Sequence, residues 1–464
     1  MAPHAGCADA HRGARRLSAG GRARVCALVA AVVLLAARGA DASEPPVPLG
    51  PCGPIDRLHA AVELRAMQLR RLKGTPLAHL GLVAWRDGVA VPIPFQVDER
   101  RGSWMAMSSG PEPSTDDTPG SVDADDVLVF MACDAGGRAP GGTPAATAGR
   151  EIRIDDPRTG TTAWAYLMVA DDPPRTTRRY VDYDPQHDMV RTAGWRIGMI
   201  QALPEYLALG LGGPLGPNIL DGLRLRAEAR LRGNLARFTL SERDGEHALA
   251  AWTAGPVRVV RRSRHAMQIG LGLHLAAGYA HTYFYALHAY GPGKLKLPFS
   301  PSVFFNDIRA FAGADLHDLE GWRYLAAGVP APGFAIDGTM DAAERAFRGA
   351  GSWFALTHPG AAVVVSLWLS DNLRAAIPLD LVYRDDAATA APPERVRGSV
   401  PFVGIEGREA QRLQAGRYEF ALRVYGIPGW KPGDERRLLA DLDAPLRVHV
   451  TRPVEFGAGP GARR

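Results

Sequence analysis

The sequence predicts an all-β protein, built from two or three β-sandwich units after a cleaved signal peptide. Three observations indicate this fold. Short apolar runs recur at intervals of about 12 to 15 residues, as the strands of all-β units do. Gly, Pro and Asp clusters typical of turns separate these runs. Long amphipathic helices are scarce, and 464 residues are enough for several packed units.

The first 42 residues have the pattern of a secretory signal peptide. Arginines precede an apolar run over residues 25–37, and Ala40-Asp41-Ala42 follows as an A-x-A cleavage site. The run is too short to cross a bilayer about 30 Å thick as a helix. We therefore expect an exported, periplasmic or extracellular protein with no transmembrane helix in the mature chain. An uncut membrane anchor is the alternative.

The charge balance gives no reason to expect a nucleic-acid partner. The whole chain has 54 Lys and Arg against 49 Asp and Glu. Removal of residues 1–42, with six Arg and two Asp, leaves 48 basic and 47 acidic residues. The mature chain is therefore almost neutral, and we expect no binding to nucleic acid.

Residues 43–190 are predicted to form an N-terminal β domain with an acidic loop. Pro92 and Pro94 limit the run VPIPFQV to an edge strand or the start of a strand. The polar stretches 102–122 and 134–149 are expected to be loops. The other strands are expected at 60–67, 80–91, 127–133, 150–154, 163–169 and 178–183.

Residues 191–390 are predicted to form a large β-sandwich domain. Residues 223–231 (LRLRAEARL) alternate apolar and polar side chains, which is typical of a half-exposed strand, and 235–240 is its expected partner. The stretch between Arg264 and Lys294 has no charged residue but several His and Gly, so we expect two buried strands joined by a turn and not a membrane span.

The remainder is expected to be strands and connections. The aromatic-rich stretch 299–324 is expected to be a loop, and Asp341–Phe347 a short helix. Residues 391–464 are predicted to be a C-terminal β segment that packs on the sandwich or extends it. The expected strands are 352–356, 361–369 and 376–383 in the large domain, and 418–425 and 446–451 in the C-terminal segment.

The mature chain contains two cysteines, because Cys7 and Cys26 lie in the leader. An even pair in an exported protein predicts a disulfide between Cys52 and Cys133. Two separate buried thiols are the alternative.

The densest acidic segment lies at residues 91–135. Asp123, Asp125 and Asp126 are close in sequence, and Asp98 is expected to approach from the preceding strand. Ca²⁺ takes about six to eight oxygen ligands, which clustered Asp side chains supply. We therefore expect these four residues to form a Ca²⁺ site. The alternative is a turn whose Asp side chains accept backbone N–H bonds.

A run of His and Tyr residues is the second candidate site. On a strand, His281, Tyr283 and Tyr285 would share one face, and His288 would lie on the other. Tyr and His on a sheet face can stack on sugar rings and bond to hydroxyls. An aromatic core is the alternative.

A third candidate site combines carboxylates with aromatic side chains in the expected loop. Asp307, Glu320 and Trp322 have the composition of a carbohydrate-binding cleft. Two carboxyl groups in such a cleft are able to act as acid and base.

Two motifs in the acidic segment at residues 91–135 resemble a signature found in uncharacterised exported bacterial proteins. They are P-x-Q-V-D at Pro94–Asp98 and D-D-x-L-V-F at Asp125–Phe130. Some of those proteins resemble the β-sandwiches of carbohydrate-active proteins such as the galactose mutarotase-like group. Family versions often have a Gly-rich spacer, where this chain has SVDADD. The resemblance implies export and a β-sandwich more than it implies a reaction.

We therefore expect an exported cell-envelope or extracellular protein that binds a glycan or an envelope partner through a β-sandwich face. One alternative is a carbohydrate-active enzyme (an epimerase, lyase or hydrolase) that uses carboxylate or His side chains of the second domain. Another is a structural component of an envelope assembly. The chain contains no G-x-S-x-G, H-E-x-x-H or P-loop motif. The sequence leaves the oligomeric state open.

Overall fold

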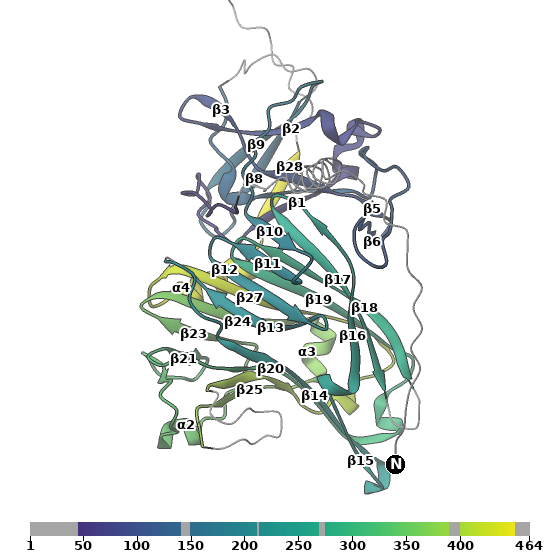
Figure 1. Cartoon of the computed structure of the whole chain (residues 1–464), viewed down its shortest axis with the longest axis vertical. Helices are drawn as coiled ribbons and strands as arrows, with labels where there is room; N and C mark the ends of the chain where they lie inside the picture. The colour runs from purple at the N-terminus through teal and green to yellow at the C-terminus, as the bar shows by residue number, and fades with distance from the viewer. Residues whose placement is uncertain (1–44, 141–148, 211–212, 269–273, 389–399, 451–464) are drawn as a thin grey trace, which may run out of the picture. The chain divides into compact units, whose positions relative to one another are not determined.

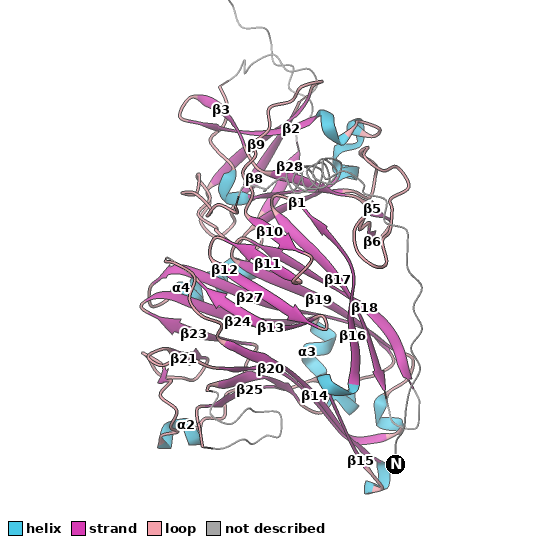
Figure 2. Cartoon of the chain, viewed as in Figure 1, coloured by secondary structure: helices cyan, strands magenta, loops and turns pink. Residues whose placement is uncertain are grey.

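The computed structural model describes residues 45–140, 149–210, 213–268, 274–388 and 400–450. Figure 1 shows that these residues form mostly strands, and Figure 2 shows that the helices are short. The predicted all-β class is confirmed. These described residues all belong to one compact unit. The expected signal peptide lies outside the described residues, and the domain boundaries near residues 190 and 390 stay predictions.

The N-terminal residues, together with one C-terminal strand, build two antiparallel sheets and a hairpin. The smaller sheet has the order β1 (Ala61–Arg65), β7 (Val127–Met131), β4 (Phe95–Asp98). The larger has the order β28 (Arg447–Val450), β8 (Arg150–Asp155), β9 (Thr162–Val169), β2 (Leu80–Arg86), β3 (Val89–Pro92). The hairpin pairs β5 (Arg100–Arg101) with β6 (Trp104–Met105). Leu64, Phe130 and Ile152 belong to one buried core, which joins the two sheets.

An antiparallel nine-stranded sheet forms the centre of the remaining chain. Its order is β16 (Gly245–Ala254), β17 (Arg258–Gln268), β18 (His274–Tyr285), β19 (His288–Leu297), β27 (Gly416–Trp430), β24 (Gly360–Leu369), β23 (Trp353–His358), β21 (Arg323–Ala326), β22 (Phe334–Ala335). The late strand β27 therefore pairs with β19 on one side and with β24 on the other.

Two further sheets pack against this one. The first has the order β10 (Val181–Asp184), β11 (Met189–Thr192), β12 (Trp195–Ile200), β13 (Leu203–Leu209). The second has the order β15 (Arg237–Ser241), β14 (Leu220–Leu231), β20 (Phe305–Leu316), β26 (Phe402–Gly407), β25 (Leu379–Arg384). Trp195 packs with Phe284 in one core, and Ile405 with Leu356 in another. Both contacts join inward faces of different sheets, as in a β-sandwich.

Among the described residues the helices have three to ten residues, and the longest is Asp434–Asp443. The predicted helix near Asp341 is confirmed: Asp341 accepts the Glu344 N–H at 2.8 Å, and Glu344 accepts the Asp341 N–H at 2.7 Å. The α-helices are α2 (Ala342–Ala346), α3 (Asp371–Ala376) and α4 (Asp434–Asp443). The 3₁₀ turns are η1 (Ala66–Leu72), η2 (Leu77–His79), η3 (Ala132–Asp134), η4 (Arg232–Asn234), η5 (Glu242–Asp244), η6 (Pro301–Val303) and η7 (Ala410–Arg412).

The expectation of a loop over residues 299–324 is wrong. The twelve-residue strand β20 occupies Phe305–Leu316 and pairs with β14 on one side and β26 on the other. Its sequence, FNDIRAFAGADL, carries few β-branched residues. It becomes a strand because two long neighbours satisfy its backbone hydrogen bonds, which is a tertiary effect.

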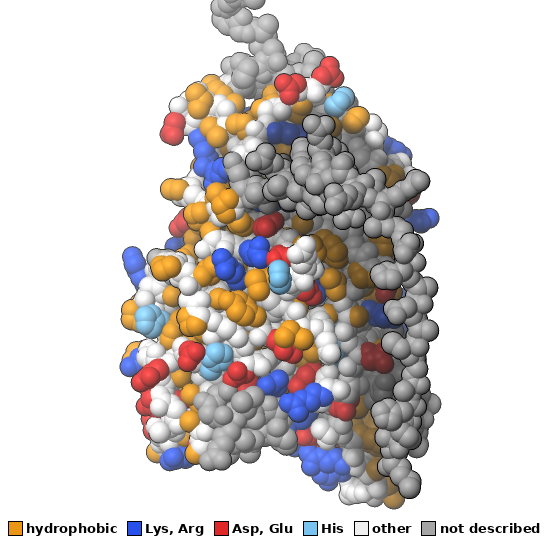
Figure 3. Space-filling model, in the orientation of Figure 1, with side chains coloured by type: hydrophobic (Ala, Val, Ile, Leu, Met, Phe, Trp, Pro, Cys, Tyr) orange, Lys and Arg blue, Asp and Glu red, His pale blue; other side chains and the backbone are white. Residues whose placement is uncertain are grey.

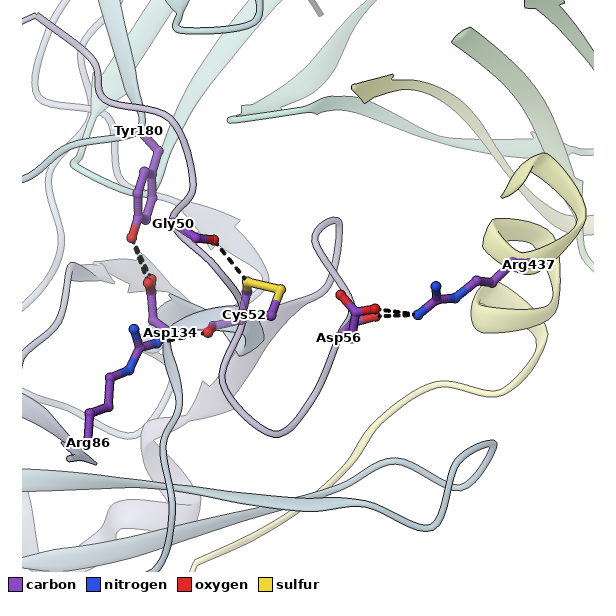
Figure 4. The surroundings of a disulfide bond; sticks show 8 residues. Gly50, Cys52, Asp56, Arg86, Asp134, Tyr180 and Arg437 are labelled. Carbon is purple, nitrogen blue, oxygen red and sulfur yellow. Dashed lines mark hydrogen bonds and ion pairs between the residues drawn. A yellow bond between two sulfur atoms is a disulfide. The ribbon is translucent and has the colours of Figure 1, made fainter. Parts of the chain in front are cut away.

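The disulfide between Cys52 and Cys133 is confirmed, with an S–S distance of 2.04 Å. Figure 4 shows its surroundings. Arg86 donates to the Cys133 carbonyl at 2.9 Å, and the Tyr180 hydroxyl donates to Asp134 at 2.7 Å. A disulfide is compatible with a location outside the cytoplasm.

The surface and the helices add two observations. On the face shown in Figure 3, acidic and basic side chains are interspersed with hydrophobic ones. Among the described residues, no helix combines the length and the apolar character needed to cross a membrane.

Candidate functional site

One face of the nine-stranded sheet collects aromatic and basic side chains. Alternate residues of a strand share a face, and so do residues paired directly across strands. β17 and β18 pair Arg262 with His281 and Arg264 with Tyr279, while β19 and β27 pair Tyr290 with Arg423. We call this surface the aromatic–basic face. It comprises Arg262, Arg264, Tyr279, His281, Tyr283, Tyr290, Trp368 and Arg423.

At the buried end of this face, Arg258 forms ion pairs with side chains of the N-terminal strands. It is 1% exposed and donates through Nε to Asp98 at 2.7 Å, and also to Glu63 and to the Tyr285 hydroxyl. Gln96 Oε1 accepts the backbone N–H of Arg258 at 2.9 Å. Asp98, an expected Ca²⁺ ligand, is therefore the counter-ion of a buried guanidinium.

Tyr285 and His288 also lie at this buried end. Their rings stack with 4.2 Å between centroids, and Tyr425 stacks on His288 at 5.3 Å. The expectation that His288 faces away from Tyr285 is wrong. β18 ends at Tyr285 and a new strand begins at His288, so the alternation restarts after the turn. Burial lowers the pKa of His288, which is therefore a neutral, packed side chain.

The open end of the face carries the most exposed rings. Tyr279 is 47% exposed, and Trp104 on β6 is 59% exposed with its ring centroid 6.5 Å from that of His281. The Tyr279 hydroxyl donates to Glu112 at 2.7 Å, and the Arg262 guanidinium lies 5.3 Å from the Tyr279 ring centroid. Burial, with the charge of Arg262, lowers the pKa of His281 to about 4. His281 is therefore neutral at pH 7, and its Nε2 has no hydrogen-bond partner among the described residues.

The rings continue across the next strands. The ring centroids of Tyr283 and Tyr290 lie 5.8 Å apart, and the Arg423 guanidinium lies 5.5 Å from the Tyr290 ring centroid. Burial raises the pKa of Tyr283 and of Tyr290, so both phenols keep their protons. Trp368 on β24 is 40% exposed and lies one strand beyond Arg423. The face therefore presents flat apolar rings beside hydrogen-bond donors and fixed positive charges.

The expected Ca²⁺ ligands Asp125 and Asp126 have other partners. Asp126 is fully buried and accepts the N–H groups of Arg100 at 3.1 Å and Asp123 at 2.9 Å. Burial raises the pKa of Asp126 to about 6. Asp125 accepts the Gly102 N–H. Both carboxyl groups hold a turn, which matches the alternative stated for this segment.

A different carboxylate set forms in the same loop. Asp116, Asp117 and Asp123 each offer one oxygen, and these atoms all lie within 4.8 Å of one another. Of the four expected ligands, only Asp123 belongs to this set. Arg101 approaches Asp117 at 4.0 Å, and both side chains are well exposed.

The third predicted site is not assembled. Asp307 lies near the start of β20, 3.5 Å from Arg309 Nε, whereas Glu320 is exposed beyond the end of the strand. Residues 307–316 of an extended strand span about 30 Å at about 3.3 Å per residue. The structure therefore does not bring these two carboxyl groups together. The Trp322 ring lies 5.4 Å from that of His358.

A pocket of ≈ 550 Å³ opens beside α2. Phe334, Phe347 and Pro330 line it, and Arg348 is its one charged side chain. None of the predicted site residues reaches it, so it offers no acid–base pair.

Comparison with known proteins gives matches among solved structures alone. No family model and no curated protein matches the chain. The chain is similar to the solved structure of an alpha-mannosidase from Enterococcus faecalis V583, with a TM-score of 0.42, 7% identity, and coverage of 85% of this chain and 44% of that one. A glycosyl hydrolase family 38 protein from Enterococcus faecalis gives a TM-score of 0.43, 8% identity, and coverage of 84% and 45%.

A third similar structure is that of a proposed aldose 1-epimerase from Escherichia coli K12. Its TM-score is 0.27 with 10% identity, and the match covers 53% of this chain and 98% of that one. The chain spans less than half the length of the first two proteins. Because all three TM-scores are below 0.5, these similarities carry no functional inference.

Sequence reasoning missed several members of the aromatic–basic face. The run RVVRRSR at 258–264 places Arg262 and Arg264 at alternate positions, which was a usable signal. Arg423 and Trp368 carried no such signal, because their place beside Tyr290 depends on pairing between distant strands.

Proposed function

We propose that this chain is an exported protein that binds an acidic glycan on the aromatic–basic face. The observation that carries the proposal is the juxtaposition of aromatic rings, exposed at Tyr279 and half-buried at Tyr290, with guanidinium groups on one sheet face. Tyr279 lies beside Arg262, and Tyr290 lies beside Arg423. Aromatic rings offer flat apolar area with a polar rim, which suits the C–H faces of sugars. Guanidinium groups pair with carboxylates and sulfates in a fixed geometry.

Binding is favoured over catalysis by the placement of the carboxyl groups. Asp307 and Glu320 lie apart, and Glu112 beside the face already accepts from the Tyr279 hydroxyl. The predicted leader and the disulfide support export, to the periplasm or the cell exterior. Binding of an envelope protein and a structural role in an envelope assembly are the alternatives.

The test is calorimetric titration of the mature chain with three probes: a uronic-acid oligosaccharide, a sulfated oligosaccharide and a neutral analogue. We expect the acidic probes to bind more tightly, and affinity to fall as salt rises. Tyr279→Ala and Arg423→Ala are each expected to weaken binding at least tenfold, which corresponds to about 1.4 kcal/mol.

Phe420→Ala is the matched control, because Phe420 is exposed on β27 but points to the opposite face from Arg423. We expect it to bind as the unaltered chain does. Equal binding by all three variants, or no affinity for either acidic probe, would refute the proposal and favour an envelope-protein partner.

A further inference from the structure

The loop between β6 and β7 contains a carboxylate set that lies outside the aromatic–basic face. Asp116, Asp117 and Asp123 place one oxygen each within 4.8 Å of one another. Two of the three side chains are buried, Asp116 at 6% exposed and Asp123 at 8%. Carboxylates this close repel one another and burial removes their hydration, and a bound cation offsets both costs.

A second observation points to a missing partner. Asp116 Oδ2 is buried and meets no hydrogen-bond donor among the described residues, whereas Oδ1 accepts the Asp117 N–H at 2.7 Å. Buried carboxylate oxygens in folded proteins are normally hydrogen-bonded or bound to a metal.

The rest of the loop is already fixed by other contacts. Asp123 accepts the Thr118 hydroxyl at 2.8 Å and the Asp125 N–H at 3.1 Å. Ser121 pairs with Pro76, and the Gly120 carbonyl accepts the Leu77 N–H at 2.9 Å. These contacts fix the Asp123 carboxylate and the backbone at residues 120–121.

We propose that Asp116, Asp117 and Asp123 bind a hard divalent cation of the Ca²⁺ type. All three ligands are oxygens, and the acidic loop tolerates the irregular coordination that Ca²⁺ accepts, with water supplying the remaining ligands. Mg²⁺ demands near-ideal octahedral geometry and is expected to bind more weakly. This ligand set shares only Asp123 with the set expected from the sequence. The proposal does not depend on glycan binding.

The experiment is calorimetric titration of the metal-stripped mature chain with CaCl₂ and with MgCl₂, together with thermal unfolding in CaCl₂ and in EDTA. We expect saturable Ca²⁺ binding near one ion per chain, weaker Mg²⁺ binding, and a higher Tm in CaCl₂. Asp116→Asn and Asp117→Asn are each expected to weaken Ca²⁺ binding at least tenfold.

Asp117 is exposed, so Asp117→Asn keeps the test decisive if Asp116→Asn fails to fold. Asp172→Asn, at an exposed carboxyl outside the loop, is the control and is expected to bind Ca²⁺ unchanged. The proposal is overturned if titration of the unaltered chain with CaCl₂ gives no heat of binding and its Tm is the same in CaCl₂ and in EDTA. It is equally overturned if Asp117→Asn binds Ca²⁺ as tightly as the control.

Discussion

At the scale of single residues, the signature P-x-Q-V-D serves an interaction that the sequence does not reveal. Gln96 and Asp98 both bind Arg258, through its backbone N–H and its guanidinium. Gln96 also donates to Asp98 at 2.6 Å. These contacts join β4 to β17. The two polar side chains therefore stabilise the packing of the three-stranded sheet against the nine-stranded sheet.

Asp98→Ala is expected to destabilise the fold by about 3 kcal/mol, because it removes the buried counter-ion of the Arg258 guanidinium. The measurement is urea unfolding followed by circular dichroism. Asp172→Ala, at an exposed carboxyl, is the control. An Asp98→Ala midpoint equal to that of the control would contradict the assigned role.

At the scale of elements, two glycines face each other where β20 meets β26. Gly313 pairs with Gly404, and the ring of Phe311 covers the space that their missing side chains leave. A Cβ atom at Gly404 would lie 2.5 Å from that ring and 2.7 Å from the Ala312 carbonyl oxygen. The pairing of these central strands therefore depends on the absence of side chains.

Gly404→Ala is expected to destabilise the fold by about 2 kcal/mol, because the ring and backbone have to shift in a packed core. Gly213→Ala is the matched control, since a Cβ atom there meets nothing within 4 Å. Thermal unfolding measures both variants. A Tm for Gly404→Ala equal to that of Gly213→Ala would contradict this prediction, because it would show that the core accommodates the added methyl group without loss of stability.

At the scale of the whole molecule, Arg57 connects segments far apart in the chain. Its Nε donates to Asp156 at 2.9 Å, and its Nη1 donates to the carbonyls of Asp441 at 2.8 Å and Ala444 at 2.7 Å. Arg57 therefore binds the β8–β9 turn and the end of α4 together. Burial alone would raise the pKa of Asp156, but hydrogen bonds from Arg57 and from the Arg158 N–H outweigh it and lower the pKa to about 2.

The pH dependence of stability follows from this shift. A carboxyl whose folded pKa lies below its unfolded value of 3.8 stabilises the fold above pH 4, and that contribution is lost as pH falls toward 2. The difference in free energy of unfolding between the unaltered chain and Asp156→Asn is therefore expected to be constant above pH 5. It should shrink by about 2 kcal/mol between pH 4 and pH 2. Urea unfolding across this range measures it, and a difference independent of pH would contradict the assignment.

The fold class was more predictable than the candidate site. Strands such as β14 and β24 alternate or concentrate apolar residues, and that local signal survives in the structure. β20 lacks the signal and was expected to be a loop. At the site, the shared face of His281 and Tyr283 follows from strand periodicity alone, whereas Arg423 and Trp368 join them only through the order of strands in the sheet.

The sequence by itself determined that this chain is built of sheets, that Cys52 pairs with Cys133, and that a short helix follows Asp341. The sheets and the helix depend on local pattern, and the disulfide depends on a count of two cysteines in the predicted mature chain, which allows one pairing and left separate thiols as the alternative. Only the tertiary structure decided that Asp98 serves Arg258 and that Asp116 and Asp117 join Asp123. The physical reason is that ion pairs and strand registers join residues far apart in sequence, and their energies depend on distances that no local pattern records.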